Sequence, residues 1–142
     1  MQRQELAINL ETPIHLSTLF VPHLRKQQPV ILNVTSGLAF APMAAVPIYC
    51  ATKATLHSFT LSLRQQLVGT SVRVLELVPP AVDTDLSGSG LHTFGVAVND
   101  FADSVMQRLA AGEEEVGYGT SKEIRQASRE QLDARFQQMN NR

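Results

Sequence analysis

Three polar residues, Ser36, Tyr49 and Lys53, stand at a spacing that suits acid–base chemistry. Tyr49 and Lys53 are four positions apart, and Ser36 precedes the tyrosine by 13 positions. Side chains four apart in a helix share a face, and a neighbouring ammonium lowers the pKa of a phenol from its usual value of about 10. Such a tyrosine can donate a proton to a carbonyl or take one from an alcohol, while a serine hydroxyl stabilises the charge on the same oxygen. We call these residues the Ser–Tyr–Lys trio.

Two predicted elements would position this trio. Residues 29–35 (PVILNVT) form a short, β-branched, apolar run that is typical of a buried strand, and Ser36 follows its last residue. Residues 48–68 contain no proline or glycine and predict a long helix, with Gly69 just past its end. Ligands of open parallel sheets bind at the carboxyl ends of the strands. The sequence therefore places the trio where such a fold would hold an active site.

The rest of the chain continues the alternation of helices and strands. Helices are predicted over residues 4–26, 99–111 and 121–139, and strands over residues 71–78 and 115–118. Pro13 interrupts the first helix and leaves the main-chain carbonyl of Asn9 without a donor. The order predicts an α/β fold, with a parallel sheet of about three strands flanked by helices. The first strand is too apolar for an exposed edge, a pattern that we expect if preceding strands are missing or are supplied by another chain.

Composition excludes several classes of function. The chain has 142 residues, which fits one domain, and its net charge of −1 offers no electrostatic attraction to nucleic acid or an anionic membrane. No apolar run approaches the roughly 20 residues of a membrane span. The single cysteine excludes an internal disulfide framework, and the four histidines have no metal-ligand spacing. We expect a cytoplasmic protein without metal, nucleic-acid or membrane partners.

Four stretches together resemble the short-chain dehydrogenase/reductase family. They are INL (residues 8–10), ILNVTSGLAF (31–40), YCATKATLHSFTLSLRQQL (49–67) and VRVLELVPPAVDTDL (72–86). The resemblance covers nearly the whole chain, and the tail is similar to a bacterial subgroup. It implies that residues 1–142 are a single domain, the C-terminal catalytic part of a Rossmann-like fold.

The resemblance also implies roles for individual residues. Tyr49 would be the proton donor or acceptor, Lys53 would lower its pKa and bond the nicotinamide ribose, and Ser36 would hold the substrate oxygen. Asn9 matches the family's helix-kink asparagine, whose free carbonyl holds a water in a proton relay. Pro79, Val82 and Thr84 would contact the nicotinamide side of the cofactor, although Pro80 replaces the family's usual glycine.

The cofactor implied is NAD or NADP, but its main binding motif is missing. The family's Thr-Gly-x-x-x-Gly-x-Gly turn and its Asn-Asn-Ala-Gly motif do not occur in residues 1–142. That turn lets the backbone approach the pyrophosphate at a helix N-terminus. We therefore expect a chain truncated relative to the family, with almost no site for adenine or pyrophosphate.

Three hypotheses follow. The first is an NAD(P)-dependent oxidoreductase that transfers hydride between the nicotinamide and a small carbonyl compound or secondary alcohol. The second is a catalytically inactive fragment or self-association module, because in the family the helices matching residues 4–26 and 48–68 form a dimer interface. The third is a longer protein with a glycine-rich turn encoded upstream. In the first case the loop over residues 83–98 would shape the substrate pocket.

Overall fold

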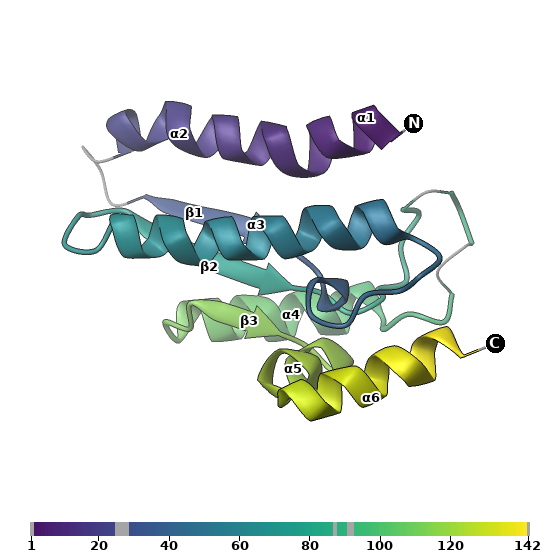
Figure 1. Ribbon diagram of the computed structural model, residues 1–142. Helices are drawn as coiled ribbons and strands as arrows, with labels where there is room; N and C mark the ends of the chain where they lie inside the picture. Colours follow the sequence, from purple (N-terminus) through teal and green to yellow (C-terminus); the bar gives the residue numbers. More distant parts are fainter. Residues whose placement is uncertain (1, 25–28, 87, 91–92, 142) are drawn as a thin grey trace.

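A parallel three-stranded sheet forms the centre of the molecule (Figure 1). The computed structural model describes residues 2–24, 29–86, 88–90 and 93–141. The strands are β1 (Val30–Val34), β2 (Arg73–Val78) and β3 (Glu115–Gly117), in the spatial order β1-β2-β3. Both pairs are parallel, with Leu32 opposite Leu75 and Leu77 opposite Val116. The predicted α/β fold with a parallel sheet of about three strands is confirmed.

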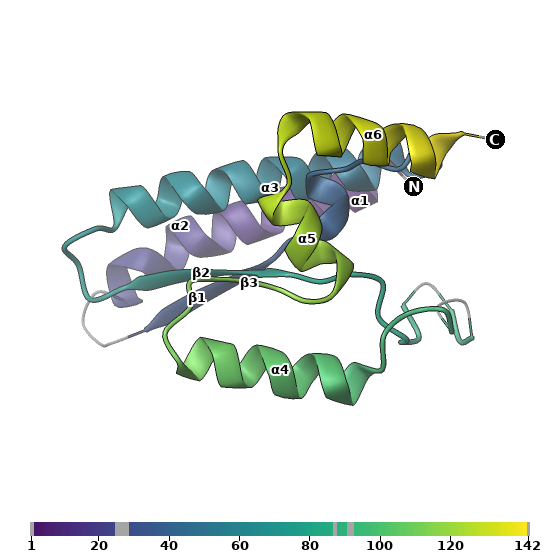
Figure 2. The same cartoon turned by 90° about the horizontal axis from the view of Figure 1, so that it is seen from below.

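Helices cover both faces of this sheet (Figure 2). The helices α2 (Thr12–Leu24) and α3 (Pro47–Gln66) lie on one face, and α4 (Val98–Ala110) lies on the other. Leu63 and Leu67 pack with Val72 and Val74 on the α3 side. On the α4 side, Val105 packs with Leu77 and Val116. The central strand is therefore buried on both faces, which its apolar sequence predicts.

The strand β1 is an edge strand, and only one of its faces is covered. Asn33 is buried and its side-chain amide donates a hydrogen bond of 2.9 Å to the Thr60 hydroxyl on α3. On the opposite face Val30, Leu32 and Val34 remain 49%, 41% and 44% exposed. The expectation of a buried strand is thus met on one face only. These side chains mark an uncovered face of the sheet, whereas a further strand would lie beside the backbone at the β1 edge.

The first helix is continuous but changes its winding near Asn9. It comprises α1 (Gln2–Leu6), a π-helical turn η1 (Ala7–Glu11) and α2. The N–H of Thr12 donates to the carbonyl of Ala7, five residues back. The wider turn lies directly before Pro13, which has no N–H to offer the regular helical ladder. The prediction of a helix over residues 4–26 is correct in type, and residues 25–26 lie outside the described residues.

The C-terminal segment forms two helices where the sequence suggested one. α5 (Thr120–Gln126) ends before Ala127, and α6 (Arg129–Asn140) begins after Ser128. The Ser128 hydroxyl accepts from the N–H of Gln131, and the Gln131 side chain accepts from the N–H of Ser128. This reciprocal capping box starts a new helix, so the single predicted helix over residues 121–139 is wrong.

Candidate active site

Ser36 lies at the carboxyl end of β1 in a tightly bonded turn. Its backbone is extended (φ −170°, ψ 154°), and its hydroxyl oxygen accepts a 3.1 Å hydrogen bond from the N–H of Leu38 in the short 3₁₀ turn η2 (Gly37–Ala39). The Gly37 N–H donates to the Pro79 carbonyl at 3.0 Å, and this bond ties the turn to the end of β2. Ser36 is therefore held at the sheet edge where the sequence placed it.

Tyr49 lies in the first turn of α3, beside this serine. Burial is the largest influence and raises the pKa of Tyr49, while a side-chain hydrogen bond with Ser36 lowers it and the Cys50 and Glu5 charges raise it further. The net direction is upward from the ordinary value. The sequence-based expectation of a lowered pKa considered only the neighbouring ammonium. In this chain desolvation of the phenolate outweighs the attractive contacts.

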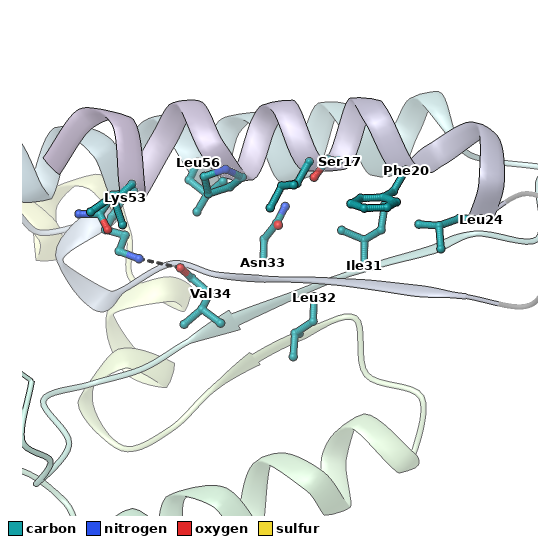
Figure 3. A pocket seen from close by; sticks show the side chains of 13 residues that line it. Ser17, Phe20, Leu24, Ile31, Leu32, Asn33, Val34, Lys53 and Leu56 are labelled. Atoms are coloured by element: carbon teal, nitrogen blue, oxygen red, sulfur yellow. Dashed lines mark hydrogen bonds between the residues drawn. The ribbon is translucent and has the colours of Figure 1, made fainter. Parts of the chain in front are cut away.

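Lys53 lies one helical turn after Tyr49. Its Nζ is 5.6 Å from the centre of the Tyr49 ring and donates a 2.8 Å hydrogen bond to the Val34 carbonyl (Figure 3). Burial lowers the pKa of the lysine amine, because the charged form is partly desolvated. The trio predicted from spacing alone therefore meets at one corner of the sheet.

Asn9 is half-buried on η1 and shares a groove with Lys53. The groove has a volume of about 500 Å³ and runs between the first helix and β1. In Figure 3, Phe20 and Leu24 point down into it from α2, and Ile31 and Asn33 point up from β1. Ser36 and Tyr49 are not among its lining residues. The structure thus places Asn9 and Lys53 in the lining of one groove, to which the serine and the tyrosine do not contribute.

The three residues expected on the nicotinamide side follow β2 in an irregular segment. Pro79 adjoins the serine turn through its bond to Gly37. Val82 forms an isolated parallel bridge with Val96, supported by the bond from the Asp83 N–H to the Val96 carbonyl at 2.9 Å. Thr84 is exposed, and its hydroxyl accepts from the Leu86 N–H at 3.4 Å. Pro79 is therefore in direct contact with the turn, whereas Val82 and Thr84 lie further along the segment.

A buried polar cluster beneath the trio escaped the sequence analysis. Glu76 in β2 is fully buried and contacts both His57 on α3 and Thr35 at the end of β1. The available signal was a glutamate in the middle of the apolar strand VLELV, because a glutamate is almost never fully buried without a partner. A histidine in the facing helix was the natural candidate for that partner.

Other kinds of site find little support in the described part of the chain. Within residues 2–24, 29–86, 88–90 and 93–141 no group of three or more His, Cys, Asp or Glu side chains could hold a metal ion. Among the same residues, no helix has the length and apolar character needed to cross a membrane. The single cysteine, Cys50, is free and buried.

Comparison with known proteins places this geometry in a family. A family model described as short chain dehydrogenase matches residues 2–93, which include all three residues of the trio. The chain belongs to the short chain dehydrogenase family. The match covers the first helix, β1, α3 and β2, which are the elements that build the site.

Relatives of known sequence or structure agree with this assignment. The chain is 45% identical to "Uncharacterized oxidoreductase DltE" of Bacillus subtilis (strain 168), over 96% of this chain and 56% of the relative. It matches a short chain dehydrogenase from Burkholderia cenocepacia J2315, solved in complex with NADP, with a TM-score of 0.83 and 29% identity over 96% of this chain and 60% of that one. A closed form of serine dehydrogenase complexed with NADP+ matches 54% of this chain and 32% of that one, with a TM-score of 0.52 and 31% identity.

The chain spans only part of the length of these relatives. It covers 56% of the Bacillus subtilis protein and 60% of the Burkholderia cenocepacia structure. The activity of a whole short chain dehydrogenase therefore enters below as a proposal for this chain.

Proposed function

We propose that this chain carries the acid–base half of an NAD(P)-dependent oxidoreductase that acts on a small carbonyl compound or secondary alcohol. The observation that carries the proposal is the meeting of Tyr49, Ser36 and Lys53 at the carboxyl edge of a parallel sheet. That edge is where open α/β sheets bind their ligands. Family membership and the two NADP-bound relatives support a nicotinamide cofactor, without distinguishing NAD from NADP.

The donor set of the site fits the nicotinamide end of such a cofactor. Tyr49 and Ser36 offer hydroxyl groups, and Lys53 offers an ammonium that can bond ribose hydroxyls. Pro79, Val82 and Thr84 follow the adjacent strand and would flank the ring. When bound, the cofactor supplies or accepts the hydride. The glycine-rich turn that cradles a pyrophosphate does not occur in residues 1–142, so this chain would contact mainly the nicotinamide and its ribose.

The protein side chains would move the proton. In reduction, the Tyr49 hydroxyl donates its proton to the substrate oxygen while the Ser36 hydroxyl holds that oxygen in place. In oxidation the proton moves from the alcohol to the Tyr49 phenolate. Lys53 would bond the ribose and stabilise the phenolate, and the Asn9 carbonyl would hold a water that returns protons to the lysine. The raised pKa of Tyr49 keeps its hydroxyl protonated at neutral pH but makes it a weaker acid than a free tyrosine.

The direct test replaces Tyr49 with phenylalanine, which removes the hydroxyl and little else. Calorimetric titration with NADH and NADPH first establishes cofactor binding to the 142-residue chain, and a screen of carbonyl compounds follows. Tyr49→Phe should reduce turnover about 100-fold or more, the range for a lost general acid. Tyr118→Phe makes the same change at the other tyrosine, which packs edge-to-face on Phe101, and should leave turnover unchanged. Undiminished activity in Tyr49→Phe would contradict the assignment of Tyr49 as the general acid.

A second candidate function is self-association without catalysis. The first helix leaves apolar side chains exposed, including Ile8 at 60%, Leu19 at 63% and Phe20 at 49%. α3 adds Leu61 at 41% exposure. We propose that the first helix and α3 form an interface between two copies of the chain. Sedimentation velocity at high micromolar concentration should show a dimer, and a clean monomer would count against this interface.

Domain organisation and location are proposals of the same kind. Residues 1–142 should behave as one domain, because a single sheet carries helices on both of its faces. Limited proteolysis should give no stable smaller fragment. The free, buried Cys50 is consistent with a reducing compartment, and we propose the cytoplasm. Cell fractionation that recovers the chain with secreted proteins would contradict this location.

A further inference from the structure

The side chain of Glu76 is fully buried in the sheet. It lies in the middle of β2 and is 0% exposed. Its Oε1 accepts a hydrogen bond of 2.6 Å from the Thr35 hydroxyl, at the end of β1. Both of its oxygens lie 2.9 Å from Nδ1 of His57 on α3. One buried carboxylate therefore joins the two strands and the helix that build the site.

His57 connects this carboxylate to the turn that holds Ser36. It follows Lys53 by one helical turn, so it shares a face of α3 with the lysine. Its ring packs against the ring of Phe40, with 4.6 Å between the centroids. Phe40 ends the 3₁₀ turn that Ser36 begins. Thr35 and Phe40 thus flank the serine in sequence, and both contact the His57–Glu76 pair.

The charge on this pair depends on a proton. A lone buried carboxylate is costly, and a protonated imidazole neutralises it. A hydrogen bond with Glu76 raises the pKa of His57, burial lowers it, and the charges of Glu76 and then Glu115 raise it further. The positive charge of Arg64, on the same helix as His57, lowers the pKa of His57. Glu115 on β3 is itself paired with Arg64 at 3.1 Å and with Arg125 on α5 at 2.6 Å, so Glu76 is the carboxylate in direct contact with the ring.

We infer that His57, Glu76 and Thr35 form a proton-dependent brace that positions Ser36 relative to Tyr49 and Lys53. This inference rests on the proposed function for its catalytic meaning, but the brace itself is a property of the folded chain. With His57 protonated, the pair is neutral and ties α3 to β2 and to the end of β1. When the proton leaves, the His57 ring no longer offers a positive charge to the buried Glu76 side chain, and the tie weakens. His57 and Glu76 are positioning residues in this scheme, since they act through Thr35 and Phe40.

The test follows the brace by NMR in the full 142-residue chain, without cofactor or substrate. The His57 ring is titrated against pH, and the backbone amides of Ser36 and Leu38 are followed in the same samples. We expect the two amide shifts to move with the midpoint of His57. Glu76→Gln keeps the size and an acceptor oxygen but removes the charge. It should lower the His57 midpoint and uncouple the amide shifts from it, whereas Glu123→Gln, at an exposed position on α5, should do neither.

The NMR results test the brace independently of any catalytic activity. Amide shifts of Ser36 and Leu38 that ignore the His57 titration in the unsubstituted chain would overturn the brace, even if Glu76→Gln fails to fold. An unchanged His57 midpoint in a folded Glu76→Gln variant would overturn it as well. If the chain shows the expected coupling but binds neither NADH nor NADPH, the brace stands and the proposed function fails. Where turnover is measurable, the limb of the kcat profile set by His57 should disappear in Glu76→Gln.

Discussion

The amine of Lys53 donates a hydrogen bond to the carbonyl oxygen of Val34, 2.8 Å away. Val34 is the last residue of β1, two positions before Ser36, and Lys53 lies one turn after Tyr49 on α3. The bond therefore fixes the helix that carries the tyrosine against the strand that ends at the serine. Lys53, for which we propose a role toward the cofactor, thus also joins the helix of Tyr49 to the strand that precedes Ser36.

Replacing Lys53 with methionine should expose this structural role. The variant keeps the aliphatic stem but removes a solvent-exposed hydrogen bond, so the free energy of unfolding should fall by about 1 kcal/mol. Chemical denaturation measures this change. Lys122→Met is the matched control, because Lys122 is exposed on α5. Equal stability of the two variants would show that the bond to Val34 contributes nothing.

The ionisation of Tyr49 can be measured directly, because the chain has only one other tyrosine. In a Tyr118→Phe background, the ultraviolet absorbance of tyrosinate reports Tyr49 alone. Its midpoint should lie above the ordinary value of about 10, since burial raises the pKa of Tyr49. Adding Ser36→Ala removes the hydrogen bond that lowers this pKa, so the midpoint should rise further.

The same titration predicts how any turnover depends on pH. Oxidation of an alcohol needs the phenolate, so its rate should increase as pH rises toward the Tyr49 midpoint, and reduction should decrease over that range. Ser36→Ala should shift both limbs to higher pH. A midpoint that stays in place or falls after Ser36→Ala would contradict the contact between the two hydroxyl groups. Ser104→Ala, on α4 away from the site, is the control.

His57 should make stability depend on pH in a defined direction. Its pKa in the folded state is raised by Glu76 above the unfolded value of about 6.5. The stabilisation is therefore fully present below about pH 6.5 and is lost as pH rises through the folded-state pKa. The difference in unfolding free energy between the unsubstituted chain and His57→Asn should be largest near pH 6 and shrink at higher pH.

Urea denaturation at several pH values checks this trend. His15→Asn makes the same change at an exposed position on α2 and should show no comparable trend. A difference that grows with pH would reverse the sign of the linkage and would mean that His57 is held neutral in the folded state.

The elements of this fold were readable from local sequence, and so was the trio. The apolar run at residues 29–35 and the uninterrupted segment at residues 48–68 each specify their element through neighbours in the chain. Tyr49 and Lys53 share a helical face for the same local reason. Ser36 could be added to them because it follows a predicted strand, and ligands of open parallel sheets bind at the carboxyl ends of the strands.

What sequence reasoning missed depends on contacts between distant segments. The pairing of His57 with Glu76 joins a helix to a strand 19 residues away, and neither residue forms a local motif. The direction of the Tyr49 pKa shift follows from burial, which only the packed structure determines. The break at Ser128 is different, because its capping signal of serine followed three residues later by glutamine was present in the sequence.

The last helix holds the loop that leads from Ser36 to Tyr49. The side-chain oxygen of Asn140 accepts from the Ala44 N–H at 2.6 Å, and its side-chain nitrogen donates to the Pro42 carbonyl at 3.1 Å. These bonds join residues that are 96 and 98 positions apart in the chain, and both partners of Asn140 lie in the loop between Ser36 and Tyr49. Asn140→Ala should lower the free energy of unfolding by about 1 kcal/mol and accelerate hydrogen exchange at Ala44. Asn141→Ala changes the neighbouring exposed residue and should leave exchange at Ala44 unchanged. If the two variants exchange alike, α6 does not restrain this loop, and the tail has no part in shaping the site.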